Sequence, residues 1–263
     1  MTELWQWQVV QDQPTLVCDL LRPWPHGFFT RHGWPQIPES LTDILDDQAS
    51  VHRVKQVHGH QVLTANQAQT VTHGPRPEAD GLTSDAPGQA LWVCTADCNP
   101  VLIGDRATGK TAAIHAGWRG TAQGILPLTV RQMQAQGSRL EDLVIAIGPA
   151  IAGDVYQVSV AVAAQVGRTI AALADIQANE EVPDQTVVDS LQDLGGTPIL
   201  ADPEPGKARL DVRQVNWWQL QQLGISADQV AIAPHCTFQE PERFFSYRRT
   251  GKKQVQWSGI VSR

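Results

Sequence analysis

The sequence LWVCTADCNPVLIGDRATGKTAAIHAGWRG, residues 91–120, alternates three short apolar segments with polar or turn residues. The apolar segments are residues 91–93, 101–103 and 112–114. Short apolar segments bounded by turn residues predict buried strands. Polar side chains at the ends of such strands lie where a rigid scaffold commonly carries chemistry. In this stretch those side chains are Asp97, Cys98, His115 and Arg119.

On the N-terminal side, period-2 alternation and turn residues predict mainly strands. Ser40 is a candidate N-cap for a helix that runs to about residue 49, and Gly59 is a candidate turn between two paired strands. The expected strands are residues 4–10, 15–17, 27–31, 51–57 and 61–65.

On the C-terminal side, helices and strands alternate. Thr121 could cap a helix that ends at Gly137, and Ser159 could open an alanine-rich helix whose apolar residues extend to Leu173. A further helix is expected over residues 210–223, and strands over 143–147, 230–233, 244–247 and 257–261. Residues 177–208 are polar, acidic and contain proline and glycine, so we expect a surface insertion there. Residues 1–263 therefore predict one α/β domain of mixed strands.

The composition excludes several classes of protein. The 263 residues are 42% hydrophobic, which is enough for a sizeable core. The formal charge is -7 and there is no lysine or arginine run, so a nucleic-acid-binding surface is not indicated. No apolar segment approaches the roughly 20 residues of a membrane span, and no signal peptide is indicated. The four cysteines are irregularly spaced, which favours free thiols in a reducing, cytoplasmic compartment.

Cys98 and His115 are the first candidates for chemistry, and His58 has the same setting of a strand followed by glycine. Two imidazoles and one thiolate could form an open tetrahedral zinc site. Without a metal, Cys98 could instead be a nucleophile with His115 as its general base. A buried thiol with two hydrogen-bonded histidines is the structural alternative, and the spacing alone favours it. His60 is the nearest competing ligand, and Cys94 is expected in the core.

Three arginines at the ends of predicted elements could bind an anion. Arg119 lies where a helix is expected to begin, Arg31 follows the strand that contains Phe28 and Phe29, and Arg248 follows an aromatic segment. A guanidinium beside an aromatic ring could hold phosphate and stack on a base. Solvent-exposed cations in ion pairs or turns are the alternative. The sequence contains no Walker-type or dinucleotide-binding glycine loop and no Gly-x-Ser-x-Gly motif.

Six motifs, taken together and in order, resemble one protein family, the laccase-domain family, which is also called the multicopper polyphenol oxidase or peptidoglycan editing factor family. The resemblance covers the chain from about Gly27 to its C-terminus. The motifs are KQVHG at residues 55–59, ADGLT at 79–83, TADCNP at 95–100, HAGWRG at 115–120, IGP at 147–149 and FFSYRR at 244–249.

The resemblance implies a single-domain layered α/β/β/α fold, related to cysteine-hydrolase-like bacterial toxin domains. It implies a zinc or copper site with His58, Cys98 and His115 as ligands. It also implies phosphorolysis of adenosine, inosine and S-methyl-5′-thioadenosine, with adenosine deamination as a second activity. Arg31, Arg119 and Arg248 would contact substrate or phosphate, and Asp97 would act as general acid/base or orient a ligand. We expect a monomer or a small homo-oligomer.

The chain departs from the family pattern in two places. The region after Arg31 lacks the usual Ser-Leu-Asn-Leu-Gly-type segment, and residues 251–254 read Gly-Lys-Lys-Gln where Thr-Gly-Arg is usual. Both changes bear on the substrate pocket. Three other functions stay open: a Cys98-dependent amidase acting on peptidoglycan precursors, a copper laccase, and a protein that only binds. Laccase chemistry needs several copper centres, for which eight scattered histidines are few.

Overall fold

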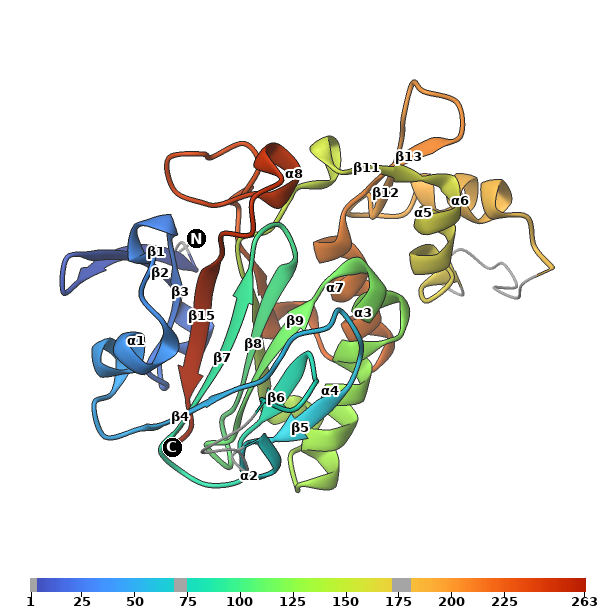
Figure 1. The fold of residues 1–263 in the computed structure, drawn as a ribbon. Helices are drawn as coiled ribbons and strands as arrows, with labels where there is room; N and C mark the ends of the chain where they lie inside the picture. Colours follow the sequence, from blue (N-terminus) through green and yellow to red (C-terminus); the bar gives the residue numbers. More distant parts are fainter. Residues whose placement is uncertain (1–3, 69–74, 172–180) are drawn as a thin grey trace.

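The computed structural model describes residues 4–68, 75–171 and 181–263. Two six-stranded sheets pack face to face, and helices cover their outer faces (Figure 1). The layers therefore run α/β/β/α within one domain, which confirms the expected mixed α/β architecture. None of the described helices is long and apolar enough to cross a membrane.

The first sheet contains both the first and the last strand of the described chain. All neighbouring strands are antiparallel except β4 and β7, and the C-terminal strand β15 lies between β3 and β7. Helix α1 (Pro38–Leu45) covers the outer face, where its Leu41 packs with Phe29 and Trp92. The strand order is β1 (Trp5–Val10), β2 (Gln13–Cys18), β3 (His26–Phe29), β15 (Gln256–Val261), β7 (Gln89–Thr95) and β4 (Ser50–Arg53).

The second sheet has β8 and β9 at its centre. Helices α4 (Ile125–Ala135) and α7 (Val212–Gln222) cover its outer face. Along β8, Val101 and Ile103 pack toward these helices and Leu102 packs between the sheets, as the period of two requires. The strand order is β14 (Val230–Ile232), β10 (Leu143–Ile147), β8 (Asn99–Asp105), β9 (Thr111–Ala116), β6 (Gly81–Thr83) and β5 (Val62–Thr64).

The core between the two sheets is fully apolar in its centre. Phe28, Leu91 and Ile260 of the first sheet meet Leu102 and Ala113 of the second, and each is 1% exposed or less. These contacts hold together β7, β8 and β9, the strands formed by residues 91–116. The loops at one end of these strands are consequently fixed by a rigid support.

A third, small sheet lies at one end of the molecule, outside the two main layers (Figure 1). It has the order β11 (Gln157–Ser159), β13 (Lys207–Leu210) and β12 (Ile199–Ala201), and it packs with α5 (Val160–Gly167) and α6 (Asp184–Gln192). The described part of the expected insertion is thus built around an apolar cluster of its own, which includes Val187 and Leu191. Residues 172–180 lie outside the described residues, with Leu173 and the start of that insertion among them.

Several expected boundaries are wrong. Helix α1 begins at Pro38 after Ile37, not at Ser40, because proline is preorganised for the first helical position. The helix expected from Thr121 is two helices, α3 (Trp118–Ala122) and α4, separated at Gly124, which has a left-handed φ of 72°. The remaining short helices are α2 (Ala65–Ala68), α8 (Tyr247–Thr250) and the 3-10 turns η1 (Asp19–Leu21), η2 (Arg31–Gly33), η3 (Leu140–Asp142), η4 (Gly153–Val155) and η6 (Ala227–Gln229).

Two expected strand assignments are also wrong. β4 and β5 belong to different sheets, so the segments on either side of Gly59 do not form a hairpin. No strand forms over residues 244–247; Phe244 and Phe245 are buried in a loop, and Ser246 caps α8 through its side chain. In both places backbone groups bind side chains instead of a neighbouring strand.

Candidate metal centre and active site

Three predicted ligands meet at one edge of the second sheet. His58 comes from the loop between β4 and β5, Cys98 from the turn between β7 and β8, and His115 from β9. One potential ligand atom from each lies within 4.8 Å of the other two. The two imidazole rings are nearly perpendicular, with centroids 4.8 Å apart. The His58–Cys98–His115 cluster thus forms as expected, while His60 is exposed and not part of it.

Asp80 is the residue that holds this cluster in place. Its carboxylate accepts a hydrogen bond from Nδ1 of His115 at 2.8 Å, and backbone N–H groups of His58 at 2.9 Å and Gly59 at 2.7 Å also donate to it. His58 has a φ of 60°, a conformation that L-residues rarely adopt, and these bonds stabilise it. Because Nδ1 of His115 donates to Asp80, Nε2 is the atom left to face a metal.

The cluster favours a thiolate at Cys98. Burial by itself would raise the pKa of Cys98, but hydrogen bonds and charge from His115 and His58 outweigh it and lower that pKa to about 6. Burial would lower the pKa of His115, yet Asp80 and Cys98 raise it to about 9. Burial would raise the pKa of Asp80, but hydrogen bonds and charge hold it below its usual value. The hydrogen bond from His115 is the largest of these lowering effects. A thiolate with flanking imidazoles is a strong set of metal donors.

The donor set fits zinc. Tetrahedral zinc bound to one sulfur and two nitrogens places its ligand atoms roughly 3.5 Å apart, and the ligand atoms here all lie within 4.8 Å of one another, so a contraction of at most about 1.3 Å gives the zinc spacing. Asp80 supplies the carboxylate contact that a ligating histidine usually has on its second ring nitrogen. Copper prefers the same soft thiolate and imidazole donors. Within residues 4–68, 75–171 and 181–263, this is the one group of three or more potential ligand residues that meets in this way.

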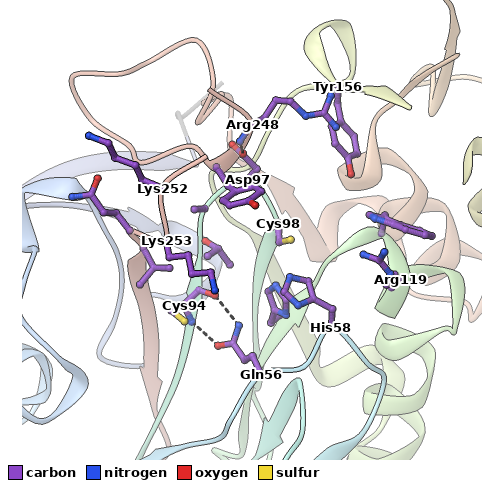
Figure 2. Close-up of a pocket in the computed structure, with 17 residues that line it drawn as sticks. Gln56, His58, Cys94, Asp97, Cys98, Arg119, Tyr156, Arg248, Lys252 and Lys253 are labelled. Carbon is purple, nitrogen blue, oxygen red and sulfur yellow. Dashed lines mark hydrogen bonds between the residues drawn. The ribbon is translucent and has the colours of Figure 1, made fainter. Parts of the chain in front are cut away.

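A cavity of about 630 Å³ opens in front of the cluster (Figure 2). Aromatic side chains and cations line it: Trp118 beneath the guanidinium of Arg119 at 4.3 Å, and Tyr156 beneath that of Arg248 at 4.8 Å. Cys94 also lines the cavity, so the expectation that it lies in the core is wrong; burial still raises its pKa to about 11. The other lining residues are Gln56, Thr95, Ala96, Asp97, Tyr247, Lys252, Lys253, Gln254 and Val255.

Asp97 lies beside Cys98, and both oxygens of its carboxylate accept hydrogen bonds. It accepts hydrogen bonds from Thr237 at 2.7 Å, from Ser246 at 3.0 Å and from the backbone N–H of Arg248 at 2.7 Å. Asp97 also has a φ of 91°, so its backbone is strained in the turn that carries Cys98. These contacts favour the expected orienting role over proton transfer, because both carboxylate oxygens already accept hydrogen bonds.

Arg119 and Arg248 reach the cavity, whereas Arg31 does not. The guanidinium of Arg31 donates to the backbone oxygen of Pro241 and lies 4.8 Å from the ring centroid of Phe245. The residues that line the cavity do not include it. Its role in substrate binding stays a prediction, and its contacts instead tie β3 to the loop before α8.

Five residues of the site are not among those predicted to act: Asp80 beside the cluster, and Gln56, Tyr156, Lys252 and Lys253 in the cavity wall. Asp80 was quoted only as part of a motif, although an aspartate directly before an apolar strand was a usable signal. Tyr156 lies in none of the six motifs, and Gln56 lies in the motif of residues 55–59; Gln56 exchanges two hydrogen bonds of 2.8 Å with the backbone of Cys94 (Figure 2). Lys252 and Lys253 were noted as departures from a family pattern, and this departure is located at the cavity.

The sequence matches the family model described as multi-copper polyphenol oxidoreductase laccase over residues 39–262. The chain belongs to this family. It is 52% identical over 263 residues to "Purine nucleoside phosphorylase slr1573" of Synechocystis, covering 99% of this chain and 98% of that protein. It is also 31% identical over 172 residues to "Adenosine deaminase RL5" from an unknown prokaryote, covering 65% of this chain and 57% of that protein.

The fold of the family member described here matches that of solved relatives. The crystal structure of YlmD from Geobacillus stearothermophilus superposes with a TM-score of 0.76 at 26% identity, covering 95% of this chain and 96% of that one. The resemblance drawn from the six motifs is therefore confirmed at the level of family and fold.

Proposed function

We propose that the protein is a metal-dependent purine nucleoside phosphorylase that cleaves adenosine, inosine and S-methyl-5′-thioadenosine with phosphate. The observation that carries the proposal is the His58–Cys98–His115 cluster at the floor of a cavity lined by aromatic rings and cations. The name of the relative that shares 52% identity supports the reaction. In this reaction a phosphate oxygen bonds to C1′ of the ribose, the C1′–N9 bond breaks, and the purine leaves with a proton.

Four cations suit the cavity to phosphate. We call Arg119, Arg248, Lys252 and Lys253 the cationic rim. None of the four forms an ion pair with a carboxylate in the described part of the chain. The one acid that lines the cavity, Asp97, has both carboxylate oxygens occupied by hydrogen bonds. On a chain of net charge -7, such a local excess of positive charge attracts an anion.

The aromatic rings under the rim suit the cavity to a purine. Trp118 and Tyr156 each face a guanidinium, and a flat base can stack against such rings while the cations contact phosphate. Zinc, with copper as the other candidate, would supply a Lewis acid that polarises a substrate atom when it is bound. His58, Cys98 and His115 would hold it. Adenosine deamination is a second proposed activity, supported by the name of a 31% identical relative.

One observation favours a second candidate, a cysteine-dependent amide hydrolase. Cys98, His115 and Asp80 form a chain of thiol, imidazole and carboxylate in which each group contacts the next. A nucleophile, a base and a group that orients the base form the same sequence of roles in cysteine hydrolases. In this reading Cys98 attacks a carbonyl carbon directly, and peptidoglycan precursors are the substrates to test.

Product analysis separates the two candidates. The purified protein, loaded with zinc, is given adenosine in phosphate buffer and the products are resolved by chromatography. Adenine with ribose 1-phosphate, dependent on added phosphate and lost in Cys98→Ala, supports the phosphorylase. Full activity of Cys98→Ala would refute it. The absence of any nucleoside product, together with iodoacetamide inactivation at the same rate with and without a chelator, would favour the hydrolase. We also propose that the protein is cytoplasmic and that it is a monomer or a small homo-oligomer. Sizing by light scattering tests the oligomeric state.

A further inference from the structure

Tyr156 lies in the wall of the large cavity, between η4 and β11, and it lines that cavity together with Cys98 and Arg119. In Figure 2 its hydroxyl points toward the part of the cavity where Cys98 and Arg119 are drawn. Burial is the main reason that the pKa of this phenol rises to about 12, and the charges of Cys98 and Arg119 also act on it, as they do on a close neighbour. The hydroxyl therefore faces the space beside these two residues.

Arg248 holds the ring of Tyr156 in this orientation. Its guanidinium lies 4.8 Å from the ring centroid and donates to the backbone oxygen of Gln157 at 2.8 Å. Its backbone N–H donates to the carboxylate of Asp97 at 2.7 Å, so the arginine is fixed at both ends. The backbone of Tyr156 is fixed as well, because its oxygen accepts a hydrogen bond of 3.1 Å from Leu210. A side chain held in this way loses little conformational freedom when its hydroxyl binds a ligand.

Two donors without a protein partner face the same space. In the part of the chain that the structure describes, the hydroxyl of Tyr156 forms no hydrogen bond. Because its pKa is raised to about 12, this hydroxyl keeps its proton at neutral pH and can donate it to an acceptor. The guanidinium of Arg119 lies 4.3 Å from the ring centroid of Trp118 and forms no ion pair with a described carboxylate.

These donors suit an oxyanion better than a neutral ligand. Asp97 is the one acid in the cavity lining, and both of its carboxylate oxygens already accept hydrogen bonds. An oxyanion has several acceptor oxygens, so it can bind the phenol hydroxyl and the guanidinium together through charge-assisted hydrogen bonds. A ribose hydroxyl could also accept a bond from Tyr156, but it would leave the charge of Arg119 uncompensated.

We infer that the hydroxyl of Tyr156 and the guanidinium of Arg119 together form the subsite for inorganic phosphate, and that Tyr156 sets the affinity for this substrate. The inference rests on the proposed function and deepens it, since it assigns phosphate to the side of the cavity next to Cys98. The other side, which Gln56 and Cys94 line, is then left for the nucleoside (Figure 2). Arg248 is a positioning residue in this arrangement, because it orients the ring of Tyr156.

A matched pair of variants isolates the hydroxyl. The chain has two tyrosines, Tyr156 and Tyr247, and both line the large cavity. Tyr156→Phe removes the hydroxyl and keeps the ring against Arg248. Tyr247→Phe makes the same change at the more exposed tyrosine, the first residue of α8, and serves as the control. Both variants keep an aromatic ring of nearly the same size, so both are expected to fold.

Steady-state kinetics of adenosine phosphorolysis are measured with zinc-loaded protein, with phosphate and adenosine varied in turn. Tyr156→Phe is expected to raise the KM for phosphate by about tenfold, as for the loss of a hydrogen bond to a charged group, and to leave the KM for adenosine within about twofold. Tyr247→Phe should resemble the wild type. An unchanged KM for phosphate in Tyr156→Phe, equal effects of the two variants, or a rise in the KM for adenosine alone would overturn the inference and leave the phosphorylase proposal intact.

Calorimetric titration of the zinc-loaded protein with inorganic phosphate supplies a readout that does not depend on turnover. The Kd for phosphate is expected to rise by about tenfold in Tyr156→Phe and to stay unchanged in Tyr247→Phe. The same Kd in Tyr156→Phe as in the wild type, or no phosphate binding by the wild type, would overturn the inference. Phosphate binding that depends on Tyr156, in a protein that cleaves no nucleoside, would support the subsite and refute the proposed function.

Discussion

The two sides of the large cavity are built in opposite ways. On the floor, Asp80 is fully buried and its carboxylate contacts the side chain of His115 and the backbone on both sides of His58. On the opposite side, Lys252 and Lys253 are exposed and line the cavity from the loop that follows α8, and in Figure 2 the side chain of Lys252 points away from the cluster. The floor is thus fixed by many buried bonds, while the rim can change shape. A site built this way keeps its metal geometry constant and tolerates substitutions that alter the substrate.

The largest expected effect compares two cysteines four residues apart. In metal-free protein, Cys98 has a pKa of about 6 and Cys94 a pKa of about 11. At neutral pH Cys98 is therefore mainly thiolate and Cys94 is thiol. The larger thiolate fraction of Cys98 speeds its alkylation, whereas the lower intrinsic nucleophilicity of a low-pKa thiolate slows it. On balance we expect Cys98 to react with iodoacetamide on the order of 100-fold faster than Cys94. Mass spectrometry of alkylated peptides between pH 5 and 8 measures the ratio.

The expected alkylation profile for Cys98 rises through a midpoint near pH 6 and is flat above pH 7. Zinc should suppress it and leave Cys94 unchanged. Equal alkylation rates at Cys98 and Cys94 would contradict the contrast between the cluster at the floor of the cavity and the wall that carries Cys94.

The next largest effect concerns the anchor of the floor. Asp80→Asn keeps the shape of the side chain but removes the charge that orients His115 and holds His58. We expect zinc affinity to fall by about 10- to 100-fold, as is usual when such a partner of a ligating histidine is lost. Competition with a chelator measures it. Glu78→Gln is the matched control, because that exposed carboxylate pairs with Lys55 and lies outside the cluster. Unchanged affinity in Asp80→Asn would show that the floor is not held as described.

A smaller effect is expected at the rim. Arg119→Ala should raise the KM for phosphate by about tenfold and leave Tm and zinc affinity close to the wild type, because the exposed guanidinium contacts Trp118 and forms no ion pair with a described carboxylate. Arg31→Ala serves as a comparison, since that residue does not line the cavity. A large loss of zinc binding in Arg119→Ala would mean that rim and floor are not independent.

The smallest effect is expected from the contrast between two buried histidines whose pKa values shift in opposite directions. His115 faces a carboxylate and has a raised pKa, whereas burial lowers the pKa of His26, which donates to Trp24 and accepts from the backbone N–H of Cys18. A lowered folded-state pKa means that stability from neutral His26 is complete above about pH 6.5 and is lost as the pH falls below it. The slope cannot exceed about 1.4 kcal/mol per pH unit for one group.

Urea unfolding between pH 7.5 and 5 measures this loss. His26→Gln, which can form similar hydrogen bonds without titrating, should have a flatter profile over that range. The same slope in both proteins would assign the acid sensitivity to other groups.

From short apolar strands bounded by turns, as in residues 91–116, the sequence predicted one α/β domain of mixed strands, whereas the layered α/β/β/α arrangement came from the family resemblance. The sequence pattern alone could not establish that His58 joins Cys98 and His115, because their spacing of 40 and 17 residues matches no compact zinc motif; the six motifs together supplied this. The errors occur where side chains replace backbone pairing. Asp80 captures the backbone of residues 57–59 and prevents the expected hairpin, and Ser246 turns an apolar segment into a helix cap. Such contacts depend on residues distant in sequence.

The position of β15 has a consequence for how the chain is made. This strand is formed by residues 256–261, yet it lies between β3 and β7 near the middle of the first sheet. During synthesis, strands from the first hundred residues must wait for it, with β3 and β7 each lacking a neighbour. The aromatic residues Phe28 and Trp92, which pack with Ile260 and Val261 of this strand, then lack that part of their cover until residues 256–261 have left the ribosome. The first sheet, rather than the second, is therefore the part of the nascent protein that stays incomplete and prone to aggregation until this strand is made.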